Sequence, residues 1–248
     1  MPDRRTELAT GLATTRERIA TACHDAGRDP AGVTLVVVTK TYPASDVSLL
    51  VDLGVTDVGE NRDQEAAAKA AQVHPAPHRP GGGAALRWHF IGRLQRNKCR
   101  SVVQYAHTVQ SVDSVRLAQA LARAAASAGR TPDVLVQVSL DGDTARGGAV
   151  DGGADRDRDL WAVAREVAAA EDGLRLGGLM AVAPLGWEPA RAFDLLAAVA
   201  ARFRAEFPQA TTLSAGMSGD LEAAVAAGAT HVRVGSAILG NRTPPAVT

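Results

Sequence analysis

The chain has 248 residues, close to the roughly 250 that one closed α/β barrel needs. Lys plus Arg and Asp plus Glu number 27 each, so no net charge attracts a phosphate backbone, and aromatic residues, at 4%, are too few to stack single-stranded nucleic acid. We therefore expect no nucleic-acid partner. No apolar run is long enough for a signal peptide or a membrane span, and Cys23 and Cys99 have no metal-ligand spacing. These absences predict a cytoplasmic protein without a membrane segment, with buried or half-buried thiols and no bound metal.

The predicted elements alternate between strand and helix along the chain. An N-terminal helix that ends at GRDP has one apolar face, formed by Leu8, Leu12, Ile19 and Cys23. Short apolar runs then predict strands at 35–40, 55–60, 87–92, 107–113, 133–140, 174–183, 211–216 and 231–235. Helical patterns separate these strands; Ser45 is expected to cap the first of them, and a Pro/Gly-rich loop is expected at 74–85. This alternation favours one domain over 1–248, a single (β/α)₈ TIM barrel with an extra N-terminal helix, over an open doubly wound sheet.

Lysine is rare in this sequence, and its positions are therefore informative. The chain has three lysines, Lys40, Lys69 and Lys98, and arginine supplies the rest of the 27. Because arginine forms no Schiff base at neutral pH, a lysine is kept where an amine is required. Lys69 has an ordinary explanation as the i,i+4 partner of Glu65 on an Ala-rich helix. Lys40 ends the first predicted strand, where barrels place their active sites, although a solvated strand-end lysine would also account for its position.

Two loops near the end of the sequence have the composition of a phosphate site. SAGMSGD places Ser214, Met217 and Ser218 before a helix, and VGSAILG places Gly235 and Ser236 after the last strand. Backbone N–H groups at helix N-termini bind phosphate where small residues allow close approach, and barrels often use the loops after strands seven and eight for this purpose. Ser218 alone would be explained as an N-cap, but the two loops together favour a phosphate cradle.

Arg233 lies between two valines on the last predicted strand, HVRVG. If the valines pack under the helices, Arg233 points into the barrel mouth, where it would bind a ligand or pair with Glu60 or Asp113. An amine, a phosphate cradle opposite it and a cation between them fit a phosphorylated aldehyde, and pyridoxal phosphate fits best. Its aldehyde would condense with Lys40. Arg233 would then approach the ring nitrogen, where a cation disfavours the protonated pyridinium.

Together the motifs resemble the pyridoxal phosphate homeostasis proteins, single-domain relatives of the alanine racemase barrel. The similarity covers nearly the whole chain, and its last block is the most specific. The matching motifs are VVVTK (36–40), DVGEN (57–61), WHFIGRLQRNK (88–98), SVD (111–113), GLMAV (178–182) and LSAGMSGDLEAAVAAGATHVRVGSAILGNR (213–242).

The resemblance implies a fold-type III pyridoxal phosphate barrel and assigns its pocket. Lys40 matches the Schiff-base lysine, and Arg233 matches the residue that faces the ring nitrogen. The phosphate-binding segments correspond to Ser214, Met217, Ser218, Gly235 and Ser236, and the motifs that line the pocket contain Asn61, Ile91 and Met180. The sequence departs from the family at four places: Arg93 stands where histidine is frequent, Arg146 stands where lysine is common, LMAVAP replaces a more usual double-proline ending, and GGADRDRD looks like an extension.

The family is described as carriers or regulators of the cofactor, without established turnover. Catalytic racemases with this barrel add a second, β-rich domain that supplies a tyrosine acid/base. Because this sequence ends after the helix that follows strand eight, we expect no such domain, no catalytic residue and a monomer. The resemblance implies intracellular homeostasis of pyridoxal phosphate, held on Lys40 for storage or for delivery to pyridoxal phosphate-dependent apo-enzymes.

Two alternatives stay open. A weak amino-acid racemase would use Lys40 with Tyr42, or with His89 at the end of the third predicted strand, as its acid and base. A phosphate-binding barrel without pyridoxal phosphate would form Schiff bases between Lys40 and sugar aldehydes, and that protein would be colourless.

Overall fold

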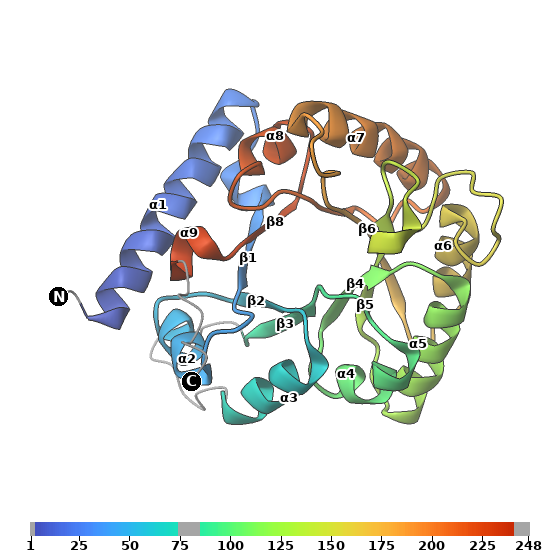
Figure 1. Ribbon diagram of the computed structural model, residues 1–248, viewed down its shortest axis with the longest axis horizontal. Coiled ribbons are helices and arrows are strands. Elements are labelled where there is room, and N and C mark those ends of the chain that lie inside the picture. The colour runs from blue at the N-terminus through green and yellow to red at the C-terminus, as the bar shows by residue number, and fades with distance from the viewer. Residues whose placement is uncertain (1–2, 74–84, 241–248) are drawn as a thin grey trace.

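The chain closes into a barrel of parallel strands, which the computed structural model describes over residues 3–73 and 85–240 (Figure 1). Each strand pairs with the next in sequence order, and the first pairs with the last. The strands are β1 (Thr34–Val38), β2 (Asp57–Glu60), β3 (Arg87–Phe90), β4 (Thr108–Val112), β5 (Asp133–Val138), β6 (Arg175–Ala181), β7 (Thr212–Ser214) and β8 (His231–Val234). The predicted (β/α)₈ architecture is confirmed.

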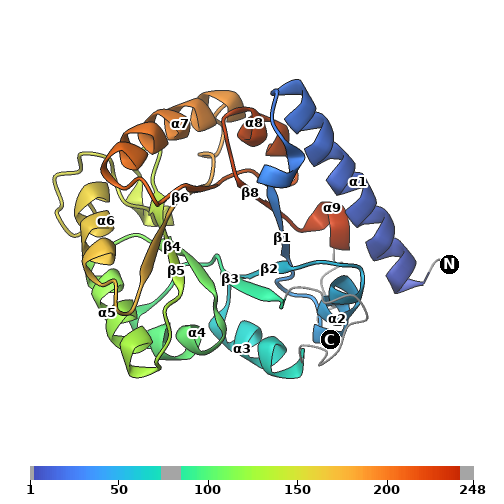
Figure 2. The same cartoon turned by 180° about the vertical axis from the view of Figure 1, so that it is seen from behind.

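Helices form an outer ring around these strands (Figures 1 and 2). The described helices are α1 (Arg4–Asp25), α2 (Ala44–Asp52), α3 (Asp63–Gln72), α4 (Cys99–Tyr105), α5 (Val115–Ser127), α6 (Leu160–Ala169), α7 (Pro189–Glu206), α8 (Leu221–Ala226) and α9 (Ser236–Leu239), with short 3₁₀ helices η1 (Pro30–Gly32), η2 (Arg96–Lys98) and η3 (Thr144–Arg146). The extra N-terminal helix is α1, which packs against α2, α8 and α9. Across the part of the chain that the structure describes, none of the helices is long and apolar enough to cross a membrane.

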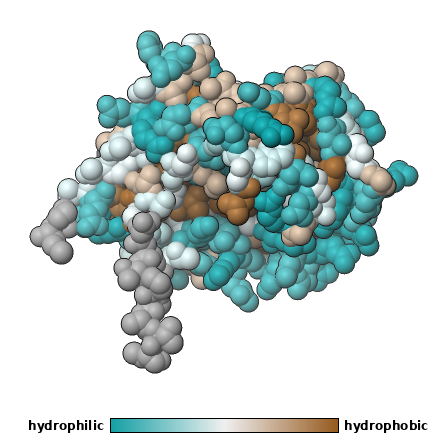
Figure 3. Space-filling view, turned by 45° about the horizontal axis from the view of Figure 1, so that its top comes forward, coloured by the Kyte–Doolittle hydropathy of each residue, from teal (hydrophilic) through white to brown (hydrophobic). Residues whose placement is uncertain are grey.

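Successive residues of each strand point alternately into the barrel and toward the helices. On β8, Val232 and Val234 are buried in the hydrophobic core, whereas Arg233 between them is buried among polar partners inside the barrel. The core between strands and helices includes Phe193 and Phe203 of α7. Figure 3 shows hydrophilic residues over most of the viewed face, with hydrophobic residues in patches between them. Most apolar contacts thus lie between the strands and the helices, and the barrel interior holds polar groups such as Arg233 beside apolar side chains such as Val36 and Met180.

Several predicted boundaries differ from the structure. Helix α2 begins at Ala44, and the extended backbone of Pro43 precedes it without a side-chain cap, so Ser45 is not its N-cap. Helix α8 begins at Leu221, with Asp220 rather than Ser218 at its N-cap position. Seven of the predicted strands run past the last residue of the observed strand, and the predicted strand at 55–60 begins two residues before β2. The predicted loop at 74–85 lies outside the described residues except for its last residue, and both cysteines are buried, as expected.

Gly178 of β6 is expected to be irreplaceable. Its φ is 145°, and a Cβ atom there would lie 1.9 Å from the Thr212 carbonyl oxygen on β7. Gly186 also has a positive φ, of 80°, but no atom lies within 4 Å of its Cβ position. We expect Gly178→Ala to lower the free energy of unfolding by more than about 3 kcal/mol, and Gly186→Ala by about 1–2 kcal/mol, from backbone strain alone. Urea denaturation measures both values, and equal losses would contradict the crowding argument.

Candidate functional site

Lys40 lies in a tight turn at the C-terminal end of β1. The Tyr42 N–H donates to the Thr39 carbonyl oxygen at 3.1 Å, so Lys40 and Thr41 are the central residues of a β-turn. Lys40 is exposed. Thr41 has a φ of 71°, a value that glycine usually supplies in turns of this kind. The turn therefore presents Lys40 to solvent at the end of the barrel where active sites lie.

The loops after β7 and β8 lie side by side. The hydroxyl oxygens of Ser218 and Ser236 are 3.4 Å apart, with Ser236 as the donor. The Arg233 backbone N–H donates to the Gly216 carbonyl oxygen at 2.9 Å, which ties the start of one loop to the strand that leads into the other. Met217, in the first loop, keeps 40% of its surface exposed. The two predicted phosphate segments are thus neighbours in space.

Gly235 brings these loops close to the turn that carries Lys40. Strands β1 and β8 are paired, and a Cβ atom on Gly235 would lie 3.1 Å from the Val38 carbonyl oxygen. A glycine allows this approach without displacing the end of the strand. The structure therefore places Lys40 and both loops at one corner of the barrel mouth.

Arg233 is buried inside the barrel, with 4% of its surface exposed. Its guanidinium donates to the Ser214 hydroxyl at 2.7 Å and to the Ala181 carbonyl oxygen at 2.8 Å. Burial lowers the pKa of Arg233 to about 10, which leaves it a cation at neutral pH. The two acidic residues that the sequence offered as partners, Glu60 and Asp113, bind Lys69 and Arg158 instead. The buried cation is therefore held by neutral groups.

A chain of hydrogen bonds leads from Arg233 through the barrel. Ser214 donates to Gln110 Oε1 at 2.7 Å, Gln110 Nε2 lies 2.9 Å from His89 Nδ1, and His89 Nε2 lies 2.8 Å from Asp57 Oδ1. All of these side chains are buried. With Arg233 donating at one end and the carboxylate accepting at the other, the order of donors and acceptors assigns the histidine proton to Nε2. His89, expected at the mouth end of its strand, is thus held inside the barrel by two partners.

Lys69 has more partners than the i,i+4 pair that the sequence predicts. The pair with Glu65 is present at 2.7 Å, but Lys69 is only 5% exposed and also donates to Glu60 at 2.8 Å and to the Thr39 carbonyl oxygen at 2.7 Å. Burial raises the pKa of Glu60. Burial also acts to raise the pKa of Glu65, but hydrogen bonds from Lys69 and from the Thr41 N–H outweigh it and lower this pKa below its usual value. Sequence reasoning missed this cluster, although the rarity of lysine pointed to Lys69 as much as to Lys40.

Asn61, Ile91 and Met180 lie at or just past the ends of β2, β3 and β6. The side-chain oxygen of Asn61 is buried and has no hydrogen-bond partner among the described residues. Such an acceptor is costly to bury, and a ligand donor would satisfy it. Ile91 packs on Gly59, where a Cβ atom would lie 3.2 Å from Ile91 Cδ1. Met180 is buried and pairs in register with Ser214 of β7.

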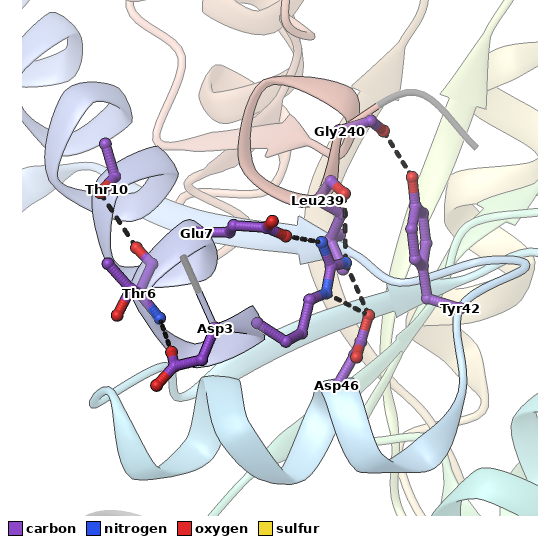
Figure 4. A network of polar contacts seen from close by, with 9 residues as sticks. Asp3, Thr6, Glu7, Thr10, Tyr42, Asp46, Leu239 and Gly240 are labelled. Carbon is purple, nitrogen blue, oxygen red and sulfur yellow. Dashed lines mark hydrogen bonds and ion pairs between the residues drawn. The ribbon is translucent and has the colours of Figure 1, made fainter. Parts of the chain in front are cut away.

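A second polar network ties α1 to the first and last β/α units (Figure 4). Arg4 binds the Asp46 carboxylate of α2 at 2.7 Å and the Leu239 carbonyl oxygen of α9 at 3.1 Å. The Tyr42 hydroxyl donates to the Gly240 carbonyl oxygen at 2.5 Å. The Tyr42 hydroxyl is therefore directed at the end of α9, and the extra helix helps to hold the two β/α units together.

Two of the departures from the family pattern, Arg93 and Arg146, both contact the loop after β5. Arg93 donates to the Ala145 carbonyl oxygen at 3.3 Å, and Arg146 pairs with Asp141 within that loop. Arg93 also lines a groove between η2 and α5, together with Arg96 and other arginines. Both substitutions thus act on the side of the mouth formed by β3, β4 and β5.

Comparison with known proteins identifies the family. The chain matches the family model of the alanine racemase N-terminal domain over residues 12–243. It is 47% identical over 252 residues to the pyridoxal phosphate homeostasis protein of Mycobacterium tuberculosis (strain ATCC 25618 / H37Rv), and the match covers 97% of this chain and 95% of that protein. The chain belongs to the pyridoxal phosphate homeostasis protein family. The resemblance stated from the motifs is confirmed.

Solved structures of similar sequence have the same fold. PipY of Synechococcus elongatus PCC7942, solved with pyridoxal phosphate bound, is 35% identical to this chain with a TM-score of 0.76, and the match covers 94% of this chain and 100% of PipY. A protein from Bifidobacterium adolescentis is 32% identical with a TM-score of 0.84, over 96% of this chain and 97% of that one. The fold of these similar chains is therefore consistent with the family assignment.

The stability of this protein is expected to fall below pH 6.5 because of His231. Burial first, and then the nearby His89, lower the pKa of His231 to about 4, so the folded state favours the neutral ring. The stabilisation is complete above the unfolded value of about 6.5 and is lost as the pH falls toward 4. Between pH 6.5 and 4.5 we expect a loss of about 2–3 kcal/mol in the wild type that His231→Gln does not show.

Urea denaturation at several pH values measures this difference. A series at pH 8 gives the cost of losing the imidazole itself, which includes its 3.0 Å contact with the Thr230 hydroxyl. Parallel pH profiles for the wild type and His231→Gln would exclude His231 as the source of the acid sensitivity.

Proposed function

We propose that this protein binds pyridoxal phosphate through a Schiff base on Lys40 and holds it for storage or delivery. The observation that carries the proposal is the difference among the three lysines. Lys69 is buried with three partners, and Lys98, on η2, lies 4.0 Å from the Asp63 carboxylate of α3. Lys40 is exposed at the mouth of the barrel, next to the loops after β7 and β8. The bound cofactor of PipY, a relative of the same size, supports this assignment.

Groups at this end of the barrel fit the aldehyde, the phosphate and a hydrogen-bond donor of the cofactor. When bound, pyridoxal phosphate supplies an aldehyde carbon, to which the Lys40 nitrogen bonds as one water molecule leaves. The hydroxyls of Ser218 and Ser236, 3.4 Å apart, would bind the phosphate together with the backbone of their loops. The buried Asn61 oxygen that lacks a partner is available to a donor on the ligand. Homeostasis of pyridoxal phosphate is the function that this arrangement supports best.

Arg233 would serve as the fixed cation near the ring. Its hydrogen bonds to Ser214 and to the Ala181 carbonyl hold the guanidinium in place, and the chain behind Ser214 restricts movement of that hydroxyl. A cation beside the ring nitrogen disfavours protonation of that nitrogen and weakens the ring as an electron sink. This arrangement favours holding the cofactor over carbanion chemistry.

The groups considered for racemase chemistry are engaged elsewhere. His89 is bound on both ring nitrogens inside the barrel, and the Tyr42 hydroxyl donates to Gly240. The Tyr105 hydroxyl is buried and donates to Asp63 at 3.4 Å, and burial raises its pKa. None of these three groups is placed as a second acid/base across the mouth from Lys40. A carrier or regulator therefore agrees better with the site than a racemase does.

Replacement of Lys40 is expected to abolish the covalent complex. Wild type incubated with pyridoxal phosphate should develop a near-visible absorption band, and borohydride should fix the cofactor on a peptide that contains Lys40. Lys40→Ala should give neither result, because no other lysine is exposed at this corner. Lys98→Ala is the matched control and should behave as wild type. If the wild type stays colourless, the sugar-aldehyde alternative takes the place of this proposal.

The racemase alternative has its own measurement. Amino acids deuterated at the α-carbon are incubated with loaded wild type and with Lys40→Ala, and loss of deuterium is followed by NMR. We expect no loss above the rate of free pyridoxal phosphate, because no second acid/base faces Lys40. Catalytic, Lys40-dependent washout would establish an enzyme in place of a carrier.

A further inference from the structure

We propose that Glu65, itself held by Lys69, is a positioning residue that maintains the strained turn at Thr41 and thereby directs Lys40 toward the cofactor site. The inference deepens the proposed function and rests on it, because it concerns how the Lys40 amine is presented. The residues that carry it lie on α3 and at the end of β2, outside the set that the motifs assigned to the pocket.

The turn has the backbone geometry of a type II turn. Thr39 accepts from the Tyr42 N–H, which makes Lys40 the second residue of the turn and Thr41 the third. In residues 3–73 and 85–240, Thr41 is the one non-glycine residue with a positive φ, so Lys40 does not share that conformation. A type II turn requires a positive φ at its third residue and normally has glycine there. A β-branched threonine at this position is strained, and the surrounding structure must hold it.

Glu65 holds the turn in this conformation. One of its carboxylate oxygens accepts the Thr41 N–H at 2.5 Å and also binds Lys69 Nζ at 2.7 Å. A hydrogen bond from a backbone N–H to a carboxylate is among the stronger ones in proteins. Because the Thr41 N–H points at α3 in this conformation, rotation of the turn toward a negative φ would break the bond.

Lys69 fixes Glu65 and the other end of the turn at once. Its ammonium donates to Glu65, to Glu60 and to the Thr39 carbonyl oxygen, and it is almost fully buried. Glu60 also accepts from the Thr39 hydroxyl at 2.6 Å. The residues on both sides of Lys40 are thereby tied to the same buried ion cluster. A buried cluster of this kind is weak evidence for stability alone, but it specifies one geometry.

The test separates positioning from stability through Thr41. If Glu65 acts by holding a strained φ, its loss is serious with threonine at position 41 and mild with glycine, which adopts a positive φ without strain. We expect Glu65→Ala to raise the dissociation constant for pyridoxal phosphate, measured by the absorption band, by about tenfold. In a Thr41→Gly background the same change is expected to raise it by less than about threefold. Equal losses in the two backgrounds would overturn the proposal.

A second readout needs no cofactor. In the wild type without pyridoxal phosphate, Glu65 should protect the Thr41 amide hydrogen from exchange with solvent. Glu65→Ala should accelerate that exchange about tenfold or more, as followed by NMR. Glu65→Gln keeps an acceptor oxygen and should retain most of the protection and of the binding. Unchanged exchange in Glu65→Ala would also overturn the proposal.

Two controls complete the design. Glu17→Ala removes an exposed glutamate from α1 and should change neither the dissociation constant nor the exchange of Thr41. Urea denaturation of each variant identifies any that fail to fold, and the Glu65→Gln comparison then decides the question. If wild type forms no adduct at all, the proposed function fails, whereas the exchange measurement still decides whether Glu65 holds the turn.

Discussion

The pairing of β1 with β8 is the contact on which the site depends. Four residue pairs, from Thr34 with His231 to Val37 with Val234, close the barrel between the first and last strands. Because all strands are parallel, closure brings their C-terminal ends to one face. The Lys40 turn and the loop that contains Gly235 meet only because these two strands are neighbours. An open sheet with the same elements in sequence order would leave β1 and β8 at opposite edges.

The barrel interior carries a polar chain where many barrels have layers of branched aliphatic residues. Arg233, Ser214, Gln110, His89 and Asp57 satisfy one another in order, so the buried cation is not left without acceptors. A partly satisfied network would be worse than an apolar interior, whereas a complete one rigidifies the groups at its ends. At the far end, burial acts to raise the pKa of Asp57, but hydrogen bonds from His89, Arg87 and Thr56 outweigh it and keep this pKa low. The network thus fixes the orientation of the Arg233 guanidinium from inside the barrel.

The order of strands and helices was predictable from the sequence because apolar runs and helical periods alternate regularly. Strand alternation also predicted that Arg233 points inward, since Val232 and Val234 had to face the helices. The partners inside the barrel were not predictable: periodicity gives the face on which His89 or Lys69 lies, but not the residue opposite it on another element. Lys69 illustrates this limit, because its neighbour Glu65 was visible in the sequence whereas Glu60 and the Thr39 carbonyl were not. The positive φ at Thr41 had no signal either, because threonine is a residue that normally avoids it.

A protein that holds and releases a cofactor has different requirements from one that performs chemistry on it. The cation at one end of the candidate site is buried and fixed by neutral partners, which, on the proposed function, favours a constant orientation of the cofactor ring. The amine at the other end is exposed and lies in a strained turn. Exposure admits water and competing amines, which shortens the life of reactive intermediates but lets a Schiff base exchange. On the proposed function, the two ends have different roles. The buried network determines where the cofactor lies. The strained turn, held through Glu65, determines how the Lys40 amine reaches it.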